Sequence, residues 1–86
     1  MPTVCMFRGI KIYFNYSEHQ PPHFHAQYGG ETVCVSIHDI EVLTGSIPSK
    51  QLKMLLGWAQ FHQSELMENW ELTQRHQAPF PIDPMK

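Results

Sequence analysis

The spacing of apolar side chains changes once along the chain, and this change constrains the fold more than any other feature. Before residue 47, apolar and polar residues alternate with a period of two, most clearly over residues 10–16 and 32–37. Such alternation is typical of β-strands with one buried face. After Pro48 the apolar residues recur at spacings of three and four, which is typical of an amphipathic helix. The sequence therefore predicts an α+β fold in which strands precede helix.

The first half of the chain predicts a small sheet. Strand-like runs occupy residues 3–7, 10–16, 23–28, 32–37 and 41–44. The first two runs are joined by Arg8-Gly9 and the third and fourth by Gly29-Gly30, and links this short favour antiparallel hairpins. We expect a mostly antiparallel sheet of three to five strands.

The second half predicts one long or broken helix packed on one face of that sheet. Pro48 suits the first helical turn, and a break is expected near residues 62–64. An inner stripe recurs at helical spacing: Leu52, Leu55, Leu56, Ala59, His62, Leu66, Trp70 and Thr73. We expect one domain over residues 1–78 and an extended, proline-rich tail over residues 79–86.

The helical region carries more large apolar residues than one sheet face needs. Met54, Trp58, Phe61 and Met67 widen its apolar face. This surplus indicates either a second contact surface, such as a dimer interface, or a fuller core in a small protein. Trp58 and Phe61, together with Tyr28, are the candidate partner-binding residues.

Size and charge limit the function classes. With 86 residues and a net charge of −2, the chain lacks the excess of Lys and Arg on which a bare nucleic-acid binder depends, although six histidines leave nucleic acid open as a partner.

Cys5 and Cys34 lie in apolar runs and are expected to be buried free thiols. The sequence offers neither a membrane span nor a secretory signal, so we expect a cytoplasmic protein.

The segment "EHQPPHFHAQYGG", residues 18–30, concentrates the chemistry of the chain. His23 and His25 are two apart on an extended run, so both imidazoles should leave the same side of the sheet, about 7 Å apart along the strand. Phe24, between them, should point into the core. A shared site at His23 and His25 depends on this strand parity.

Metal binding is one interpretation of the segment. His19, His23 and His25 form an H-x3-H-x-H pattern that could supply three ligands to Zn²⁺, the candidate cofactor. Glu18 or His62 is a distant candidate for a fourth ligand.

Acid–base catalysis is a second interpretation, with His23 and His25 as the catalytic pair of a small ribonuclease. Arg8 or Lys11 would stabilise developing negative charge. The prolines and histidines could instead only shape a corner of the fold, or form an edge that docks a protein by strand addition. Whether the chain is an enzyme stays open at this stage.

The stretches "PPHFHAQYG" and "LTGSIP", and a W-x3-H-x3-L-x2-N-W pattern, together resemble the bacterial domain-of-unknown-function 4160 family. In this chain the pattern falls on Trp58, His62, Leu66, Asn69 and Trp70. The resemblance implies a small accessory protein without an agreed activity or an assigned catalytic residue. It also implies genes that neighbour a second family, domain of unknown function 2442, in arrangements resembling toxin–antitoxin modules. A protein partner of that second type, or a homodimer, is therefore expected.

Overall fold

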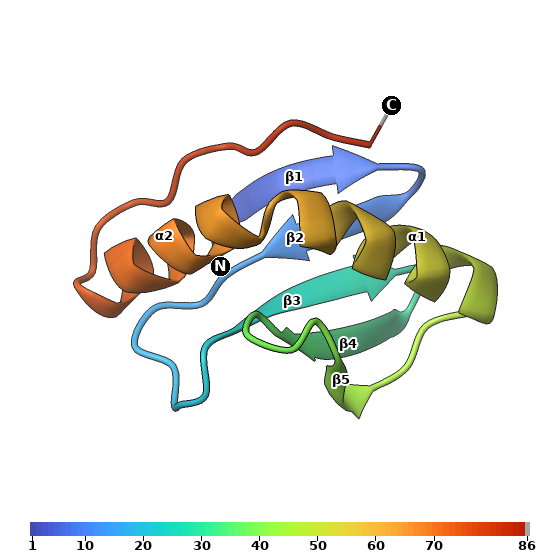
Figure 1. Cartoon of the computed structure of the whole chain (residues 1–86), viewed down its shortest axis with the longest axis horizontal. Helices are drawn as coiled ribbons and strands as arrows, with labels where there is room; N and C mark the ends of the chain where they lie inside the picture. The colour runs from blue at the N-terminus through green and yellow to red at the C-terminus, as the bar shows by residue number, and fades with distance from the viewer. Residues whose placement is uncertain (86) are drawn as a thin grey trace.

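Five strands lie side by side in chain order, each antiparallel to the next, and two helices cover one face of the sheet (Figure 1). The computed structural model describes residues 1–85. The elements are β1 (Thr3–Phe7), β2 (Ile10–Tyr13), β3 (His23–Tyr28), β4 (Glu31–Ser36), β5 (Val42–Gly45), α1 (Ser49–Phe61) and α2 (Gln63–Gln74). The α+β prediction is confirmed, with the sheet at the upper end of the expected strand number.

Two local backbone features, a hairpin turn and a close approach at a glycine, set the strand register. Arg8 and Gly9 both have positive φ, at 49° and 78°, as the two-residue hairpin turn between β1 and β2 requires. Gly45 has φ +80°, and a Cβ there would lie 2.3 Å from the carbonyl oxygen of Thr32. Only glycine fits this close approach, which adjoins an irregularity in the β4–β5 register.

The register separates the two faces of the sheet. Ile12, Ala26 and Val33 are partners across β2, β3 and β4, and all three are buried beneath the helices. One residue along, Tyr13, His25 and Cys34 are partners on the opposite face. Strand parity is confirmed: Phe24 is fully buried, and the imidazoles of His23 and His25 lie together with ring centroids 5.1 Å apart.

The helical region is broken at His62, one of the two forms expected. The φ of His62 is −114°, and its amide donates to the carbonyl oxygen of Ala59 at 3.2 Å. Leu55, Trp58 and Leu66 are buried against the sheet. No helix within residues 1–85 is both long and apolar enough to cross a membrane.

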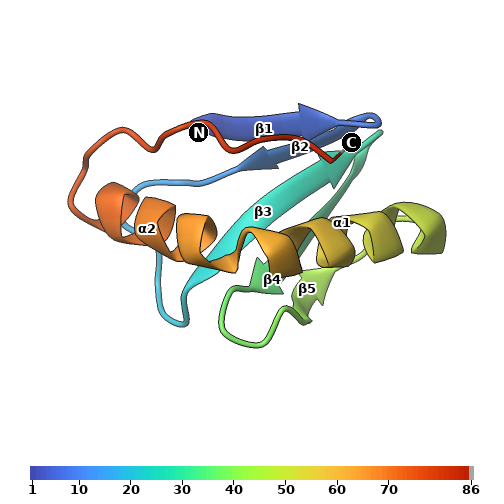
Figure 2. The same cartoon turned by 45° about the horizontal axis from the view of Figure 1, so that its top comes forward.

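The C-terminal segment runs along β1 (Figure 2). The Ile82 amide donates to the carbonyl oxygen of Val4 at 2.8 Å, and the Ile82 side chain is buried. The indole N–H of Trp58 donates to the carbonyl oxygen of Asp83 at 2.8 Å. Of the extended tail expected over residues 79–86, residues 79–85 contain no helix or strand and pack against the first strand and α1, and residue 86 lies outside the described residues.

Candidate metal centre

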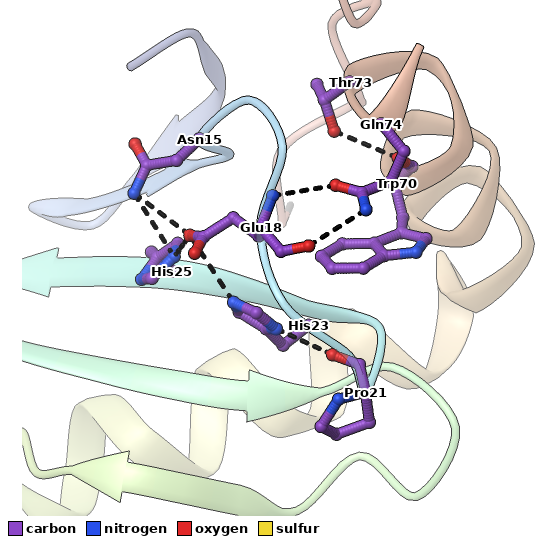
Figure 3. A network of polar contacts seen from close by, with 8 residues as sticks. All are labelled: Asn15, Glu18, Pro21, His23, His25, Trp70, Thr73 and Gln74. Atoms are coloured by element: carbon purple, nitrogen blue, oxygen red, sulfur yellow. Dashed lines mark hydrogen bonds and ion pairs between the residues drawn. The ribbon is translucent and has the colours of Figure 1, made fainter. Parts of the chain in front are cut away.

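Three potential metal ligands converge where β3 begins (Figure 3). Glu18, His23 and His25 each offer one donor atom, and these three atoms all lie within 4.8 Å of one another. The histidines come from β3, whereas Glu18 comes from the loop between β2 and β3. All three side chains are partly or mostly buried, which fixes their relative positions.

The orientation of the His23 ring is set by a backbone carbonyl. His23 Nδ1 lies 2.7 Å from the carbonyl oxygen of Pro21, which can only accept a hydrogen bond, so the ring proton is on Nδ1. In the neutral ring the lone pair is then on Nε2, and this nitrogen lies 3.5 Å from Glu18 Oε1. The Trp70 ring packs against the imidazole, with centroids 5.1 Å apart.

His25 bonds directly to the same carboxylate oxygen. Its Nε2 donates to Glu18 Oε1, and the Asn15 amide donates to that oxygen at 3.1 Å. The imidazole stacks on Tyr13, with ring centroids 5.1 Å apart and planes 12° apart. The ring is therefore held by a stacking partner as well as by its hydrogen bond.

Two opposing effects act on the Glu18 carboxyl. Partial burial by itself raises its pKa, but the hydrogen bonds from His25 and Asn15 and the charge of the nearby imidazoles outweigh burial. The net result is a pKa below the ordinary value of 4.5. Glu18 is accordingly an ionised carboxylate near neutral pH, the form that binds a metal ion.

The two other titratable neighbours on this face are poorly suited to act as anions. Burial, followed by the charge of Glu18, raises the pKa of the Cys34 thiol, and a hydrogen bond with Thr44 only partly offsets this. Burial likewise raises the pKa of Tyr13, with further contributions from Cys34 and Glu18. Because a nucleophilic cysteine needs a lowered pKa, the geometry does not favour Cys34 as a nucleophile.

One of the three donor separations matches that around a metal ion. Donor atoms bound about 2.0–2.2 Å from a tetrahedral ion lie roughly 3.3–3.6 Å apart. The separation of His23 Nε2 from Glu18 Oε1, 3.5 Å, falls within that range. His25 and Glu18 are joined by a hydrogen bond, and an ion bound between them would replace the proton of that bond.

The structure divides the residues predicted for this site. His23 and His25 meet as expected, but His19 is exposed and lies outside the group of converging donors. Glu18 stands in its place. His62 is on the helical side, where its Nδ1 lies 2.6 Å from Glu65 Oε1.

The residues considered for stabilising negative charge lie elsewhere. Arg8 is in the turn at the far end of β2. Lys11 is nearer, with its Nζ 5.6 Å from the centroid of the Tyr13 ring.

Several residues of the site were not predicted. Tyr13 and Asn15 follow the period-two pattern of the second strand, but their contact with His25 requires the β2–β3 register, which the pattern alone does not give. Trp70 and Gln74 come from α2, and no local signal in the sequence connects them with the histidine segment.

The candidate partner-binding residues differ in exposure. Trp58 is only 1% exposed and packs against the Phe7 and Phe24 rings, and Tyr28 is half-buried against the core. Phe61, in contrast, is 90% exposed. Of the surplus apolar residues, Met54 and Met67 also pack on the core, so Phe61 alone projects fully into solvent.

The fold and the cluster together define a small α+β protein with a two-histidine, one-carboxylate constellation at the start of a central strand. Residues 9–71 match the sequence profile of a family described as a domain of unknown function, DUF4160. The chain belongs to the DUF4160 family. Comparisons with curated proteins and with solved structures found no match.

Proposed function

We propose that the Glu18–His23–His25 cluster binds a divalent metal ion, with Zn²⁺, which sites of two imidazoles and one carboxylate are known to hold, as the candidate ion. The observation that carries this proposal is the convergence of three donor atoms within 4.8 Å of one another, with His23 Nδ1 hydrogen-bonded to the carbonyl oxygen of Pro21. Metal-bound histidines commonly donate their second ring N–H to a carbonyl in this way.

The three donors would leave at least one position of the ion open, which distinguishes this site from a closed, four-ligand structural site. An ion held there lowers the pKa of a bound water and polarises carbonyl or phosphoryl oxygens. Glu18 and His25, each about one fifth exposed, leave the centre accessible to a small molecule. The side chains of Tyr13 and Trp70 hold the two rings in place.

Elemental analysis of the untagged protein and titration calorimetry with Zn²⁺ test the proposal. We expect one equivalent of bound ion in the wild-type protein and a loss of binding in His23→Ala and His25→Ala. His19→Ala serves as the matched control, because it removes a neighbouring imidazole that lies outside the cluster. Less than about a tenth of an equivalent of metal under saturating conditions would contradict the proposal.

Acid–base catalysis by the same two imidazoles is the second candidate, and the observation favouring it is the 5.1 Å between the ring centroids. If His23 and His25 are the acid–base pair of a ribonuclease, the protein should cleave RNA even in the presence of a chelator. The His23→Ala and His25→Ala variants should each lose this activity. Cleavage that requires added metal would instead assign the activity to the metal centre.

A protein-binding role, as half of a toxin–antitoxin-type pair, is supported by the exposure of Phe61. This ring borders an apolar groove lined by Gly57, Trp58, His62 and residues 83–85. A purified partner of the domain-of-unknown-function 2442 type should bind the wild-type chain and bind Phe61→Ser at least about tenfold more weakly. Light scattering measures homodimer formation in the same samples. Equal binding of the partner by wild type and Phe61→Ser would contradict a role for Phe61.

A further inference from the structure

One amide side chain on α2 holds the backbone of Glu18 (Figure 3). Gln74 Oε1 accepts a hydrogen bond from the Glu18 amide at 2.9 Å, and Gln74 Nε2 donates to the Glu18 carbonyl oxygen at 2.9 Å. Both main-chain groups of Glu18 are therefore bonded to a single residue that is 56 positions away in the sequence.

Contacts between the loop and the helical region also involve the two residues before Glu18. Ser17 Oγ lies 2.7 Å from Nε2 of His76, and the Tyr16 ring stacks on the His76 ring with centroids 6.0 Å apart. Gln74, the last residue of α2, and His76, just beyond the helix, thus contact three consecutive loop residues. These contacts fix the path of the loop relative to the sheet.

The three ligands differ in how their backbones are held. His23 and His25 belong to β3, which pairs with strands on both sides. Glu18 lies outside every helix and strand, so the sheet hydrogen bonds do not place it. The position of its carboxylate depends on the loop, and the loop depends on its contacts with α2.

We propose that Gln74 is a positioning residue of the metal centre: by fixing the Glu18 backbone, it holds the carboxylate against the two imidazoles. This inference rests on the metal-binding function proposed above and adds a regulatory consequence. Binding free energies are reciprocal, so an ion held by Glu18 also strengthens the contact between the loop and α2. Any change that moves the end of α2 alters the affinity for the ion.

A second glutamine on α2 provides a matched control. Gln63 Nε2 donates to the carbonyl oxygens of Ile37 and His38, at 2.6 and 3.1 Å. This contact uses the same chemistry at the opposite end of the helix, and it touches none of the three ligands. Methionine is close to glutamine in size and removes the hydrogen bonds while keeping the aliphatic part of the side chain.

The first test compares the Zn²⁺ affinities of wild type, Gln74→Met and Gln63→Met by calorimetry. Loss of an outer contact of this kind lowers metal affinity by about 10–100-fold, and we expect this loss in Gln74→Met. Gln63→Met should stay within about threefold of wild type. Equal affinities for wild type and Gln74→Met would overturn the inference.

The second test needs no metal and separates the inference from the proposed function. The ¹⁵N imidazole signals of the metal-free protein report the hydrogen bond between His25 and Glu18. We expect Gln74→Met to shift the His25 signals toward those of Glu18→Gln, and Gln63→Met to leave them unchanged. If wild type binds no Zn²⁺, the metal-binding proposal fails, and this spectrum alone decides whether Gln74 positions the carboxylate.

A third variant removes only one of the two hydrogen bonds of Gln74, so a graded effect can be told apart from a general loss of folding. Gln74→Glu keeps an acceptor for the Glu18 amide but loses the donor to the Glu18 carbonyl oxygen. Its Zn²⁺ affinity and its His25 signals should lie between those of wild type and Gln74→Met. Signals identical to those of wild type in both Gln74 variants would overturn the positioning role.

Discussion

Within residues 1–85, histidines contact a carboxylate at two places, and only one of these places resembles a metal centre. In the first, Glu18 meets His23 and His25, and residues of β2, β3, the intervening loop and α2 hold the three side chains. In the second, His62 Nδ1 contacts Glu65 Oε1 at 2.6 Å, three residues apart at the start of α2. Both contain an imidazole bonded to a carboxylate, so the contact alone does not define a site.

The difference lies in what surrounds each contact. The His62–Glu65 contact brings no third donor, and the Glu65 side chain is 42% exposed. The Glu18 cluster adds a second imidazole, and its side chains are between 10% and 22% exposed. Converging donors with their outer hydrogen bonds satisfied, rather than one short polar contact, are what a metal ion requires.

The largest expected effect comes from removing each carboxylate in turn. Glu18→Gln should lower the Zn²⁺ affinity by more than about 100-fold, because it removes a charged ligand and not only an outer contact. Glu65→Gln should leave the affinity within about threefold of wild type, because its carboxylate lies outside the cluster. Calorimetry under identical conditions measures both, and similar losses in the two variants would show that the two contacts are equivalent.

The next effect is the pH dependence of metal binding. Zn²⁺ must displace the proton that His25 shares with Glu18 and must compete with protons for His23, so the affinity should fall as the pH decreases from 8 to 5.5, on the order of tenfold or more. Titrations in buffers of different ionisation enthalpy measure the protons released. An affinity that stays constant over this pH range would contradict binding through two histidines.

The sequence indicated one half of this site more clearly than the other. The alternation of His23, Phe24 and His25 was enough to predict which side chains share a face, because strand parity is a local property. The sequence pattern offered His19 as the third donor and Glu18 only as a distant fourth, whereas the structure brings Glu18 to the two imidazoles, since which residue reaches them around the proline corner depends on the path of the loop. Contacts with Gln74 and His76 set that path, and they are not visible in the local sequence.

The prediction of the fold was limited in the same way, to features that depend on a few neighbouring residues. The five strands and the break at His62 follow from apolar spacing and turn residues, which act over a few positions. The surplus of apolar residues on the helices did not reveal that Trp58 fills the core while Phe61 projects into solvent. That distinction depends on how α1 crosses the sheet, and it appeared only with the packed structure.

A smaller effect concerns stability in acid. The pKa of Glu18 is lower in the folded protein than its ordinary value of 4.5, so its contribution to stability is complete above that value and is lost as the pH falls through the folded pKa. Glu18→Gln should therefore show a smaller loss of stability between pH 5 and pH 3 than wild type does. Urea unfolding of the metal-free proteins at a series of pH values measures this difference. Parallel curves for the two proteins would contradict the interpretation of Glu18 as a stabilised carboxylate.

The smallest effect is expected at the second contact. His62→Gln removes the ring that bonds to Glu65 and packs against Trp58 at a centroid distance of 5.0 Å. Partly exposed pairs at helical spacing contribute about 0.3–0.5 kcal/mol, and glutamine keeps a polar group at the position, so the free energy of unfolding should fall by less than about 1 kcal/mol. Zn²⁺ affinity should not change. A large loss of affinity in His62→Gln would mean that the two contacts communicate along α2, from His62 just before the helix to Gln74, which holds the Glu18 backbone.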